Sequence, residues 1–309
     1  MTIKMRTEDY RVIDLFCGCG GLSLGFQNAG FNIVSAFDWW DAALNIYRKN
    51  FNHSAIKRDL SNTDDLVDLE AFHPDIIIGG PPCQDYSTAG HMDETRGRAI
   101  LTVSFAKIVE QIRPKYFLME NVAAIEKSKT LKVVNEIFKN AHYGLTQLIL
   151  DASRCGVPQK RRRFITFGIL DGKDHEAENI FKEGLSEKSL TLREYFGDRL
   201  GFQYYFRVPT NYSRRGIYSI DEPSMTIRGV DRPVPKGYKG HPADSAPLTP
   251  DIRTLTFQER SWIQTFPKDF IWEGSKTIIN QIIGNAVPVK LAEYIANCIK
   301  KYIENNEDS

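Results

Sequence analysis

A cysteine that follows a short apolar strand is the residue of this sequence best placed to do chemistry. The predicted strand covers Asp75–Ile78, and two glycines and two prolines, residues 79–82, stand between it and Cys83. The glycines allow unusual backbone angles and close approach of a ligand, whereas the prolines fix φ and stiffen the loop. The alternative is a buried structural cysteine. A thiol held rigidly beyond the end of a strand is instead placed to react, so we predict that Cys83 is a nucleophile.

A carboxylate and a run of cations stand beside two later predicted strands. Glu120 follows the apolar strand Tyr116–Met119, where a carboxylate is a candidate general acid. Four consecutive cations, residues 160–163, lead into the strand Phe164–Ile169. From the residues alone these cations could also form a solvated surface. The sequence therefore offers an acid and cations for the same site as Cys83.

The first predicted strand, Arg11–Phe16, opens into a glycine-rich loop at residues 17–21 and then a helix, Leu22–Ala29. Strand, glycine loop and helix are the arrangement by which an open parallel sheet holds a nucleotide-like ligand. A dinucleotide fingerprint would need glycine where Ser23 stands, and the Gly-Lys-Ser/Thr of a P-loop is absent. The loop therefore favours S-adenosylmethionine, which has no phosphate.

A second predicted strand, Asn32–Phe37, ends at Asp38 and Trp39. An acid at the end of the second strand is well placed to accept two ribose hydroxyls. The neighbouring indole can stack on adenine. The alternative for Trp39 is packing in the core.

These segments together resemble the DNA methyltransferases that modify carbon 5 of cytosine. The family's catalytic loop is matched by Gly80-Pro81-Pro82-Cys83-Gln84-x-Tyr86-Ser87, with tyrosine where phenylalanine is usual. Further motifs follow in the family's order: Phe16-x-Gly18-x-Gly20-Gly21, Glu120-Asn121-Val122, Gln159-x-Arg161-x-Arg163, Arg253-x-Leu255-Thr256-x-x-Glu259, Gln264-x-Phe266-Pro267 and Gly284-Asn285-Ala286-Val287-Pro288. The resemblance covers nearly the whole chain. Departures are Asp38, where the family usually has glutamate, and Trp262, which stands near the place of a usual arginine.

The resemblance implies a role for each of several side chains. The implied catalytic set is Cys83, Glu120, Arg161 and Arg163, with both arginines pointing toward the catalytic loop. The implied cofactor is S-adenosylmethionine, held by Phe16, Gly18, Gly20, Gly21, Asp38, Trp39, Asp59, Leu60, Pro81, Leu101, Asn285 and Val287. The implied DNA contacts are Gln84, Ser87, Arg214, Arg215, Thr226 and Arg228.

Composition excludes several classes of protein. The chain has 309 residues and a net charge of +1, and no apolar run approaches the roughly 20 residues that span a bilayer. Residues 1–10 are polar, so we expect no signal peptide. The five cysteines are odd in number and irregular in spacing, which argues against a disulfide scaffold and for a reducing cytoplasm. No cysteine or histidine spacing suggests a metal site.

Charge is concentrated in one part of the chain. Residues 199–239 contain eight basic residues against three acidic ones, with six aromatic residues between Tyr204 and Tyr238. The alternative is a solvated loop region. Cations interleaved with aromatic rings suit a nucleic-acid surface better.

We therefore expect an α/β fold: a doubly wound, mostly parallel, Rossmann-like sheet with a second, smaller, irregular β-rich target-recognition domain. The expected division is residues 1–180 for catalysis and cofactor binding, 181–275 for target recognition, and 276–309 for a segment returning to the first domain. The expected partner is double-stranded DNA, bound by a monomer. Alternatives are a transfer-RNA cytosine methyltransferase built on the same motifs and a catalytically silent DNA-binding regulator.

Overall fold

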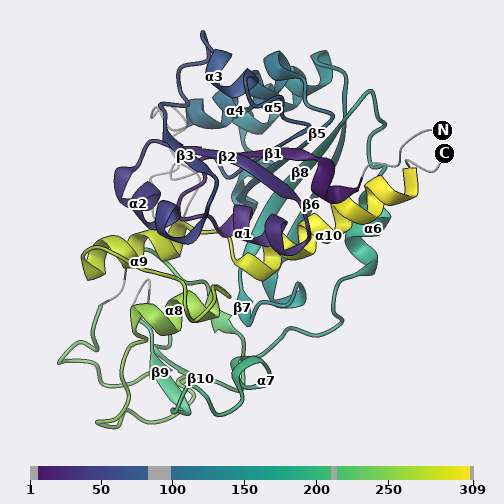
Figure 1. Ribbon diagram of the computed structural model, residues 1–309. Coiled ribbons are helices and arrows are strands. Elements are labelled where there is room, and N and C mark those ends of the chain that lie inside the picture. The colour runs from purple at the N-terminus through teal and green to yellow at the C-terminus, as the bar shows by residue number, and fades with distance from the viewer. Residues whose placement is uncertain (1–5, 83–98, 210–213, 231, 307–309) are drawn as a thin grey trace.

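The computed structural model describes residues 6–82, 99–209, 214–230 and 232–306 of the chain. Within them, seven strands form one sheet in the order β3-β2-β1-β4-β5-β8-β6 (Figure 1). The strands are β1 (Arg11–Leu15), β2 (Asn32–Asp38), β3 (Ser54–Lys57), β4 (Ile76–Gly79), β5 (Tyr116–Val122), β6 (Tyr143–Asp151) and β8 (Arg162–Leu170). Pairing is parallel from β3 to β5, and β8 runs antiparallel to both β5 and β6. The expected mostly parallel sheet is confirmed.

Helices cover both faces of the sheet because its strands are apolar on both sides. In β1, Val12 packs into the cluster that contains α1 and α10, whereas the next residue, Ile13, packs into the cluster of α4 and α5. The helices of the large lobe are α1 (Gly21–Asn28), α2 (Asp41–Asn50), α3 (Val67–Glu70), α4 (Ala99–Ile112), α5 (Lys129–Asn140), α6 (Glu178–Glu183) and α10 (Val289–Asn306). Short 3₁₀ turns are η1 (Thr7–Asp9), η2 (Ala123–Lys127) and η3 (Ala152–Arg154). The doubly wound arrangement is thus confirmed as well.

The C-terminal helix lies against the first helix of the chain. A Cβ atom on Gly25 of α1 would lie 2.4 Å from Cβ of Ala292 in α10, a distance that real side chains do not reach. Glycine is therefore required for the two helices to pack this closely. Figure 1 shows α10, in yellow, running beneath the sheet beside α1.

A small lobe, defined here as residues 192–263, lies below the sheet in Figure 1. It contains α7 (Leu192–Phe196), β9 (Tyr204–Phe206), β10 (Ile217–Ser219), β11 (Ser224–Met225) and α8 (Phe257–Ile263), with α9 (Lys276–Asn285) between it and the sheet. The pair β9–β10 is antiparallel, whereas β11 pairs in parallel with β7 (Gln159–Lys160) of the large lobe. The small lobe is irregular, as the sequence led us to expect, although the sequence did not predict α7. The domain boundaries at 180/181 and 275/276 stay predictions.

Helix α8 begins with a reciprocal cap. The Thr256 hydroxyl accepts a hydrogen bond from the Glu259 backbone N–H, and the Glu259 carboxylate accepts one from the Thr256 backbone N–H. Arg253 adds an ion pair to the same carboxylate, with Nη2 2.6 Å from Oε1. This part of the resemblance therefore marks a structural helix start.

Candidate active site

The carboxyl ends of β1, β4 and β5 meet at one edge of the sheet, because these three neighbours run parallel. A Cβ atom on Gly80, just after β4, would lie 3.3 Å from Oε2 of Glu120 and 4.0 Å from Cγ2 of Val287. The loop that leads to the candidate nucleophile therefore starts against the candidate acid. Three predicted residues of this loop, Cys83, Gln84 and Ser87, lie outside the described residues.

Glu120 forms an ion pair with Arg163. The register of β5 with β8 pairs Val122 with Arg163, so the arginine lies diagonally across from Glu120 on the neighbouring strand. Its Nε lies 2.7 Å from Oε1 of Glu120, and the two side chains are only 12% and 9% exposed. The contact is an ion pair without hydrogen-bond geometry, because Oε1 of Glu120 is buried and accepts no hydrogen bond among the described residues. The arrangement presents a carboxylate and a guanidinium together at the strand edge, as the catalytic prediction requires.

Arg161 is buried, and its guanidinium is hydrogen-bonded to main-chain carbonyl groups. Its guanidinium donates to the carbonyl oxygens of Ile227 (3.1 Å), Gly284 (3.1 Å) and Ala286 (3.0 Å), and its side chain is buried. Burial, followed by the nearby charge of Arg163, lowers the pKa of Arg161 well below its ordinary value. The catalytic loop lies outside the described residues, so the expectation that Arg161 acts with Arg163 on that loop stays a prediction. Its described contacts are with main-chain carbonyls of distant segments.

The glycine loop after β1 is tied to the end of β2. The Asp38 carboxylate accepts hydrogen bonds from the backbone N–H groups of Gly18 and Trp40, both at 2.8 Å. Burial raises the pKa of Asp38 above its ordinary value. Phe16 adopts a φ of 59°, a costly conformation for a residue with a side chain and one that clusters at functional sites. The sequence predicted Asp38 as a ribose acceptor; the structure shows that it also shapes the loop.

The glycines of this loop leave room on one side and none on the other. A Cβ atom on Gly18, at φ 54°, would meet no atom within 4 Å, whereas one on Gly21 would lie 2.2 Å from the carbonyl oxygen of Val287. A Cβ atom on Gly20, at φ 95°, would overlap the ring of Phe51. The loop therefore has an open side at Gly18 and is packed against the C-terminal segment at Gly21. This open cradle fits a ligand that approaches the backbone closely, as S-adenosylmethionine is predicted to do.

Trp39 is 63% exposed, so the alternative that it packs in the core is wrong. The Nζ atom of Lys57 lies 5.0 Å from the centroid of its ring. Asp59 accepts hydrogen bonds from the backbone and the hydroxyl of Ser61, which hold its pKa below the usual value. Stacking of Trp39 on adenine and contact of Asp59 with the cofactor stay predictions.

The other predicted cofactor residues differ in exposure. Leu60, Pro81 and Val287 are buried, Leu101 in α4 is half-buried, and Asn285 is exposed. Of these, Val287 is joined to the site by its two close approaches to the glycine loop and to Gly80. Cofactor contacts of the other four residues remain predictions, as does that of Val287.

A buried acid beside the glycine loop was missed by the sequence analysis. Asp14 in β1 is inaccessible to solvent and accepts a 2.6 Å hydrogen bond from the Ser23 hydroxyl, which in turn accepts one from Tyr47. Burial raises the pKa of Asp14 to about 7. The available signal was an acid inside the apolar strand Val12–Leu15, two residues before Phe16.

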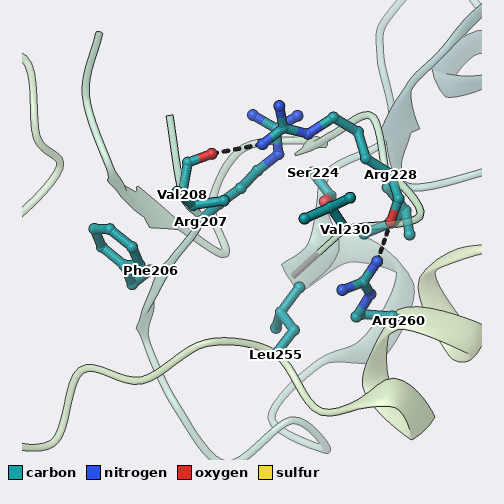
Figure 2. A pocket seen from close by; sticks show the side chains of 9 residues that line it. Phe206, Arg207, Val208, Ser224, Arg228, Val230, Leu255 and Arg260 are labelled. Carbon is teal, nitrogen blue, oxygen red and sulfur yellow. Dashed lines mark hydrogen bonds between the residues drawn. The ribbon is translucent and has the colours of Figure 1, made fainter. Parts of the chain in front are cut away.

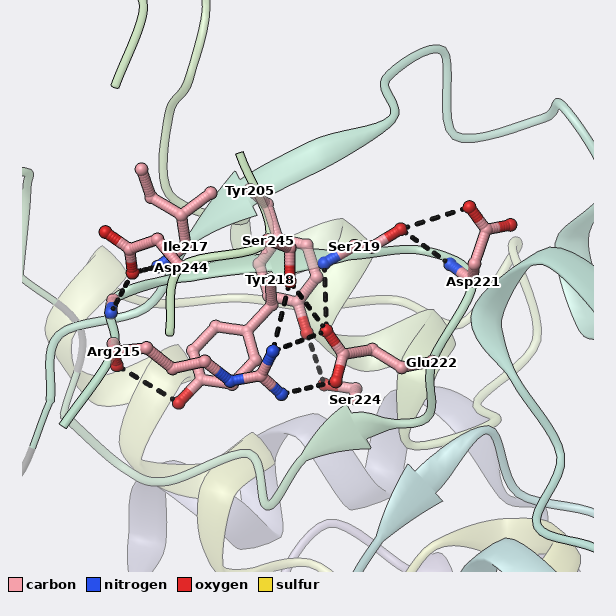
Figure 3. A network of polar contacts seen from close by, with 11 residues as sticks. Tyr205, Arg215, Ile217, Tyr218, Ser219, Asp221, Glu222, Ser224, Asp244 and Ser245 are labelled. Carbon is pink, nitrogen blue, oxygen red and sulfur yellow. Dashed lines mark hydrogen bonds and ion pairs between the residues drawn. The ribbon is translucent and has the colours of Figure 1, made fainter. Parts of the chain in front are cut away.

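Arg215 was predicted to contact DNA, and the structure gives it a structural role. Its guanidinium pairs with the Glu222 carboxylate and donates to the Ser245 hydroxyl at 3.0 Å (Figure 3). The same group lies 4.3 Å from the ring centroid of Tyr218. The charge of Arg215 is matched within the small lobe by Glu222, and a DNA contact of Arg215 stays a prediction.

Arg228 lines a small pocket of the small lobe together with Arg207 and Arg260 (Figure 2). Arg228 donates to the carbonyl of Val208 at 2.6 Å, and Arg207 donates to the carbonyl of Thr226 at 3.1 Å. Arg207 is one of the eight basic residues of the window 199–239, but the sequence predicted no specific role for it. The predicted DNA contacts of Arg228 and of the exposed Arg214 remain predictions.

Thr226 uses its hydroxyl within the protein. Its Oγ1 donates to the carbonyl of Lys160 at 2.7 Å, across the boundary between the lobes. The contact therefore helps to join β7 to the small lobe, and a DNA contact of Thr226 stays a prediction.

Two further features are absent from the described residues. No group of three or more histidine, cysteine, aspartate or glutamate side chains there could hold a metal ion. None of the helices described is both long enough and apolar enough to cross a membrane.

Comparison with known proteins gives one consistent result. The family model described as C-5 cytosine-specific DNA methylase matches residues 10–301. The chain is 51% identical over 291 residues to Type II methyltransferase M.HindV of Haemophilus influenzae, covering 94% of this chain and 96% of that protein. It is 48% identical over 294 residues to Type II methyltransferase M.HgiDI of Herpetosiphon aurantiacus, covering 95% of each.

Solved structures share the fold. The Dnmt2 methyltransferase of S. pombe superposes with a TM-score of 0.70 at 21% identity, covering 96% of this chain and 98% of that one. The methyltransferase EhMeth of Entamoeba histolytica gives a TM-score of 0.67 at 18% identity, with 97% and 99% covered. At these identities the likeness concerns the fold alone.

Proposed function

This chain belongs to the C-5 cytosine-specific DNA methylase family, and we propose that it methylates carbon 5 of cytosine in double-stranded DNA through a covalent bond to Cys83. It is a DNA cytosine methyltransferase that uses S-adenosylmethionine. High identity to two Type II methyltransferases over nearly the whole chain supports a role in a restriction–modification system. The observation that carries the proposed mechanism is the start of the Cys83 loop against the Glu120–Arg163 pair.

The need for a nucleophile follows from the substrate. Carbon 5 of cytosine is a poor nucleophile, so the Cys83 thiolate first forms a bond to carbon 6, and the ring electrons move to make carbon 5 nucleophilic. After carbon 5 has taken the methyl group, its proton leaves to a base, and the carbon–sulfur bond breaks to release the thiolate. In a duplex the ring faces are stacked, so the target cytosine must be flipped out of the helix.

Glu120 and Arg163 act on the ring while the thiolate adds. The addition pushes negative charge toward N3 of cytosine, and a proton held or shared by Glu120 neutralises it. Arg163 lies beside that carboxylate and can donate to O2 of the same ring. The β5–β8 pairing brings Glu120 and Arg163 side by side on neighbouring strands.

Three of the residues predicted to bind the cofactor, Gly18, Asp38 and Trp39, lie at or just after the ends of β1 and β2. S-adenosylmethionine, when bound, supplies an electrophilic methyl group on its sulfonium. The open side of the glycine loop at Gly18 would admit the methionine part, Asp38 would accept the ribose hydroxyls, and the exposed ring of Trp39 would cover adenine.

The DNA duplex is proposed to lie against the small lobe, whose residue range contains the basic and aromatic window 199–239. Phosphate contacts there would position the duplex, and base-edge contacts would read its sequence. We further propose that the enzyme acts as a monomer, and in the compartment that holds the chromosome, which in bacteria is the cytoplasm.

The test of this function is sequencing of bisulfite-treated DNA from a host that expresses the protein. Protection of one cytosine within one short sequence is expected, because unmodified cytosines are converted and 5-methylcytosine is not. A host that expresses the Cys83→Ser variant is the control and should show no protected site. Full conversion of the DNA together with protected cytosines in transfer RNA would contradict the proposal and favour the RNA alternative.

Removal of two protein side chains that are predicted to bind the cofactor should weaken its binding strongly. Asp38→Ala combined with Trp39→Ala is expected to cost about 3 kcal/mol of S-adenosylmethionine affinity, from lost bonds to a charged acceptor and one lost stacked ring. Calorimetry measures this directly. Trp39→Ala alone should leave the melting temperature unchanged, since the ring is exposed. Unchanged affinity of the double variant would remove both residues from the site.

A further inference from the structure

Three buried side chains meet where the small lobe joins the sheet. Gln159 lies in β7, Arg161 lies between β7 and β8, and Gln264 follows α8. Gln159 and Gln264 are inaccessible to solvent, and Arg161 is 2% exposed. We call these three residues the junction.

The two glutamines form a directed chain of hydrogen bonds. Gln159 Nε2 donates to Oε1 of Gln264 at 2.8 Å, and Oε1 of Gln159 accepts from the Ile227 backbone N–H at 2.8 Å. Gln264 Nε2 donates to the carbonyls of Ile283 at 2.6 Å and Ala286 at 3.1 Å. The amides thus connect β7, the segment after β11, and the end of α9.

Arg161 connects the same segments a second time. Its three carbonyl acceptors lie at Ile227, which follows β11, and at Gly284 and Ala286, at the end of α9. Among the described residues no salt bridge reaches this guanidinium, so its contacts are all with main-chain groups. A buried cation that bonds only to carbonyls holds backbone segments in place, because each acceptor is fixed in direction.

The backbones at the junction are also in direct contact. A Cβ atom on Gly284 would lie 2.1 Å from the backbone nitrogen of Gly229, which leaves no room for a side chain. Ser224 and Met225 of β11 pair with Gln159 and Lys160 of β7. Residues 224–229, which include Arg228, are therefore held by β7 at one end and by Gly284 of α9 at the other.

We propose that Gln159, Arg161 and Gln264 are positioning residues that set the orientation of the small lobe, so that the lobe can hold a duplex while one of its cytosines reaches the Glu120–Arg163 pair. This inference rests on the proposed function. The two glutamine amides and the Nη atoms of Arg161 are hydrogen-bonded in this arrangement, whereas the buried Nε of Arg161 has no partner among the described residues. A shifted lobe would leave more buried polar groups without partners. A loosened junction should therefore weaken productive DNA binding and sequence discrimination while the chemical step on bound DNA is kept.

The test compares matched glutamine-to-methionine variants, which keep side-chain length and remove the hydrogen bonds. Gln159→Met and Gln264→Met act at the junction. Gln147→Met is the control, because the half-buried Gln147 is hydrogen-bonded within the protein, to Asn135 and Thr166, but lies on β6 away from the small lobe. The probe is a duplex that contains the site found by bisulfite sequencing, with a second duplex altered at one base pair.

Each junction variant should raise KM for the cognate duplex about tenfold, the equivalent of one net buried hydrogen bond. The single-turnover rate at saturating DNA should stay within about threefold of wild type, and calorimetric S-adenosylmethionine affinity should be unchanged. Preference for the cognate duplex should fall. The increase in KM of the double variant should be smaller than the product of the two single-variant increases, because both single variants remove the same Gln159–Gln264 hydrogen bond. The control variant should leave KM for DNA unchanged.

Three results would overturn the inference. One is a fall in the saturating rate without a change in KM, which would make these residues catalytic. Another is a lower melting temperature with KM and discrimination intact, which would make the junction merely structural. The third is the same KM change in Gln147→Met. If a methionine variant does not fold, Gln159→Asn or Gln264→Asn, which keeps an amide but shortens its reach, is measured in the same way. Wild-type methylation in the same assay tests the proposed function separately.

Discussion

A Cys83→Ser variant should form no covalent complex with a duplex that carries 5-fluorocytosine at the target position. Release of the cysteine requires the substituent on carbon 5 to leave as a cation, which a proton does readily and fluorine does not. Wild-type enzyme should therefore transfer the methyl group and stall as an adduct that survives a denaturing gel and depends on S-adenosylmethionine. A serine hydroxyl is far less ionised than a thiol, so turnover on ordinary DNA should fall on the order of 10⁴-fold or more.

The same experiment has internal controls. The Cys83→Ser variant should still bind DNA, since phosphate contacts do not depend on the thiol. Four other cysteines, Cys17, Cys19, Cys155 and Cys298, are buried and free, and burial raises the pKa of each thiol above its ordinary value. Mass spectrometry should thus find the crosslink on Cys83 alone. A crosslink on any other cysteine, or normal trapping by Cys83→Ser, would remove Cys83 from its assigned role.

A Glu120→Gln variant should lose about 10²- to 10⁴-fold in methyl transfer, the usual range for an acid–base group. The amide cannot hold or share an acidic proton at N3, and it removes the charge that orients Arg163. DNA binding should be retained, and adduct formation with 5-fluorocytosine should be slow. Single-turnover methylation with saturating DNA and cofactor is the measurement, because it isolates steps up to methyl transfer.

The variant Glu259→Gln is the matched control for Glu120→Gln. The Glu259 side chain is also 9% exposed and also pairs with an arginine, Arg253, but it caps α8. It should lower the melting temperature and leave the single-turnover rate unchanged. Equal slowing by both variants would mean that the loss at Glu120 reflects folding rather than proton transfer. A Glu120→Gln enzyme with the wild-type rate would exclude Glu120 as the acid.

The sequence by itself determined the strands and the loops that carry reactive groups. The expected strands at Asp75–Ile78 and Tyr116–Met119 appear as β4 and β5, within one to three residues. Short apolar runs followed by glycine, proline or a charged residue are local signals, because they depend on neighbours along the chain. Parallel strands bring their carboxyl ends to one edge, so the meeting of Gly80 and Glu120 could also be predicted.

The tertiary structure alone decided what each arginine does. Arg161 and Arg163 match the same motif, yet one bonds to carbonyls 66 to 125 residues away and the other pairs with Glu120. Arg215 likewise pairs with Glu222 and donates to Ser245, contacts that the sequence did not predict. A guanidinium presents five donors in a fixed fork, and the acceptors that it meets come from segments brought together only by packing. Motif spacing shows which cations are present, and long-range packing selects the one that pairs with Glu120.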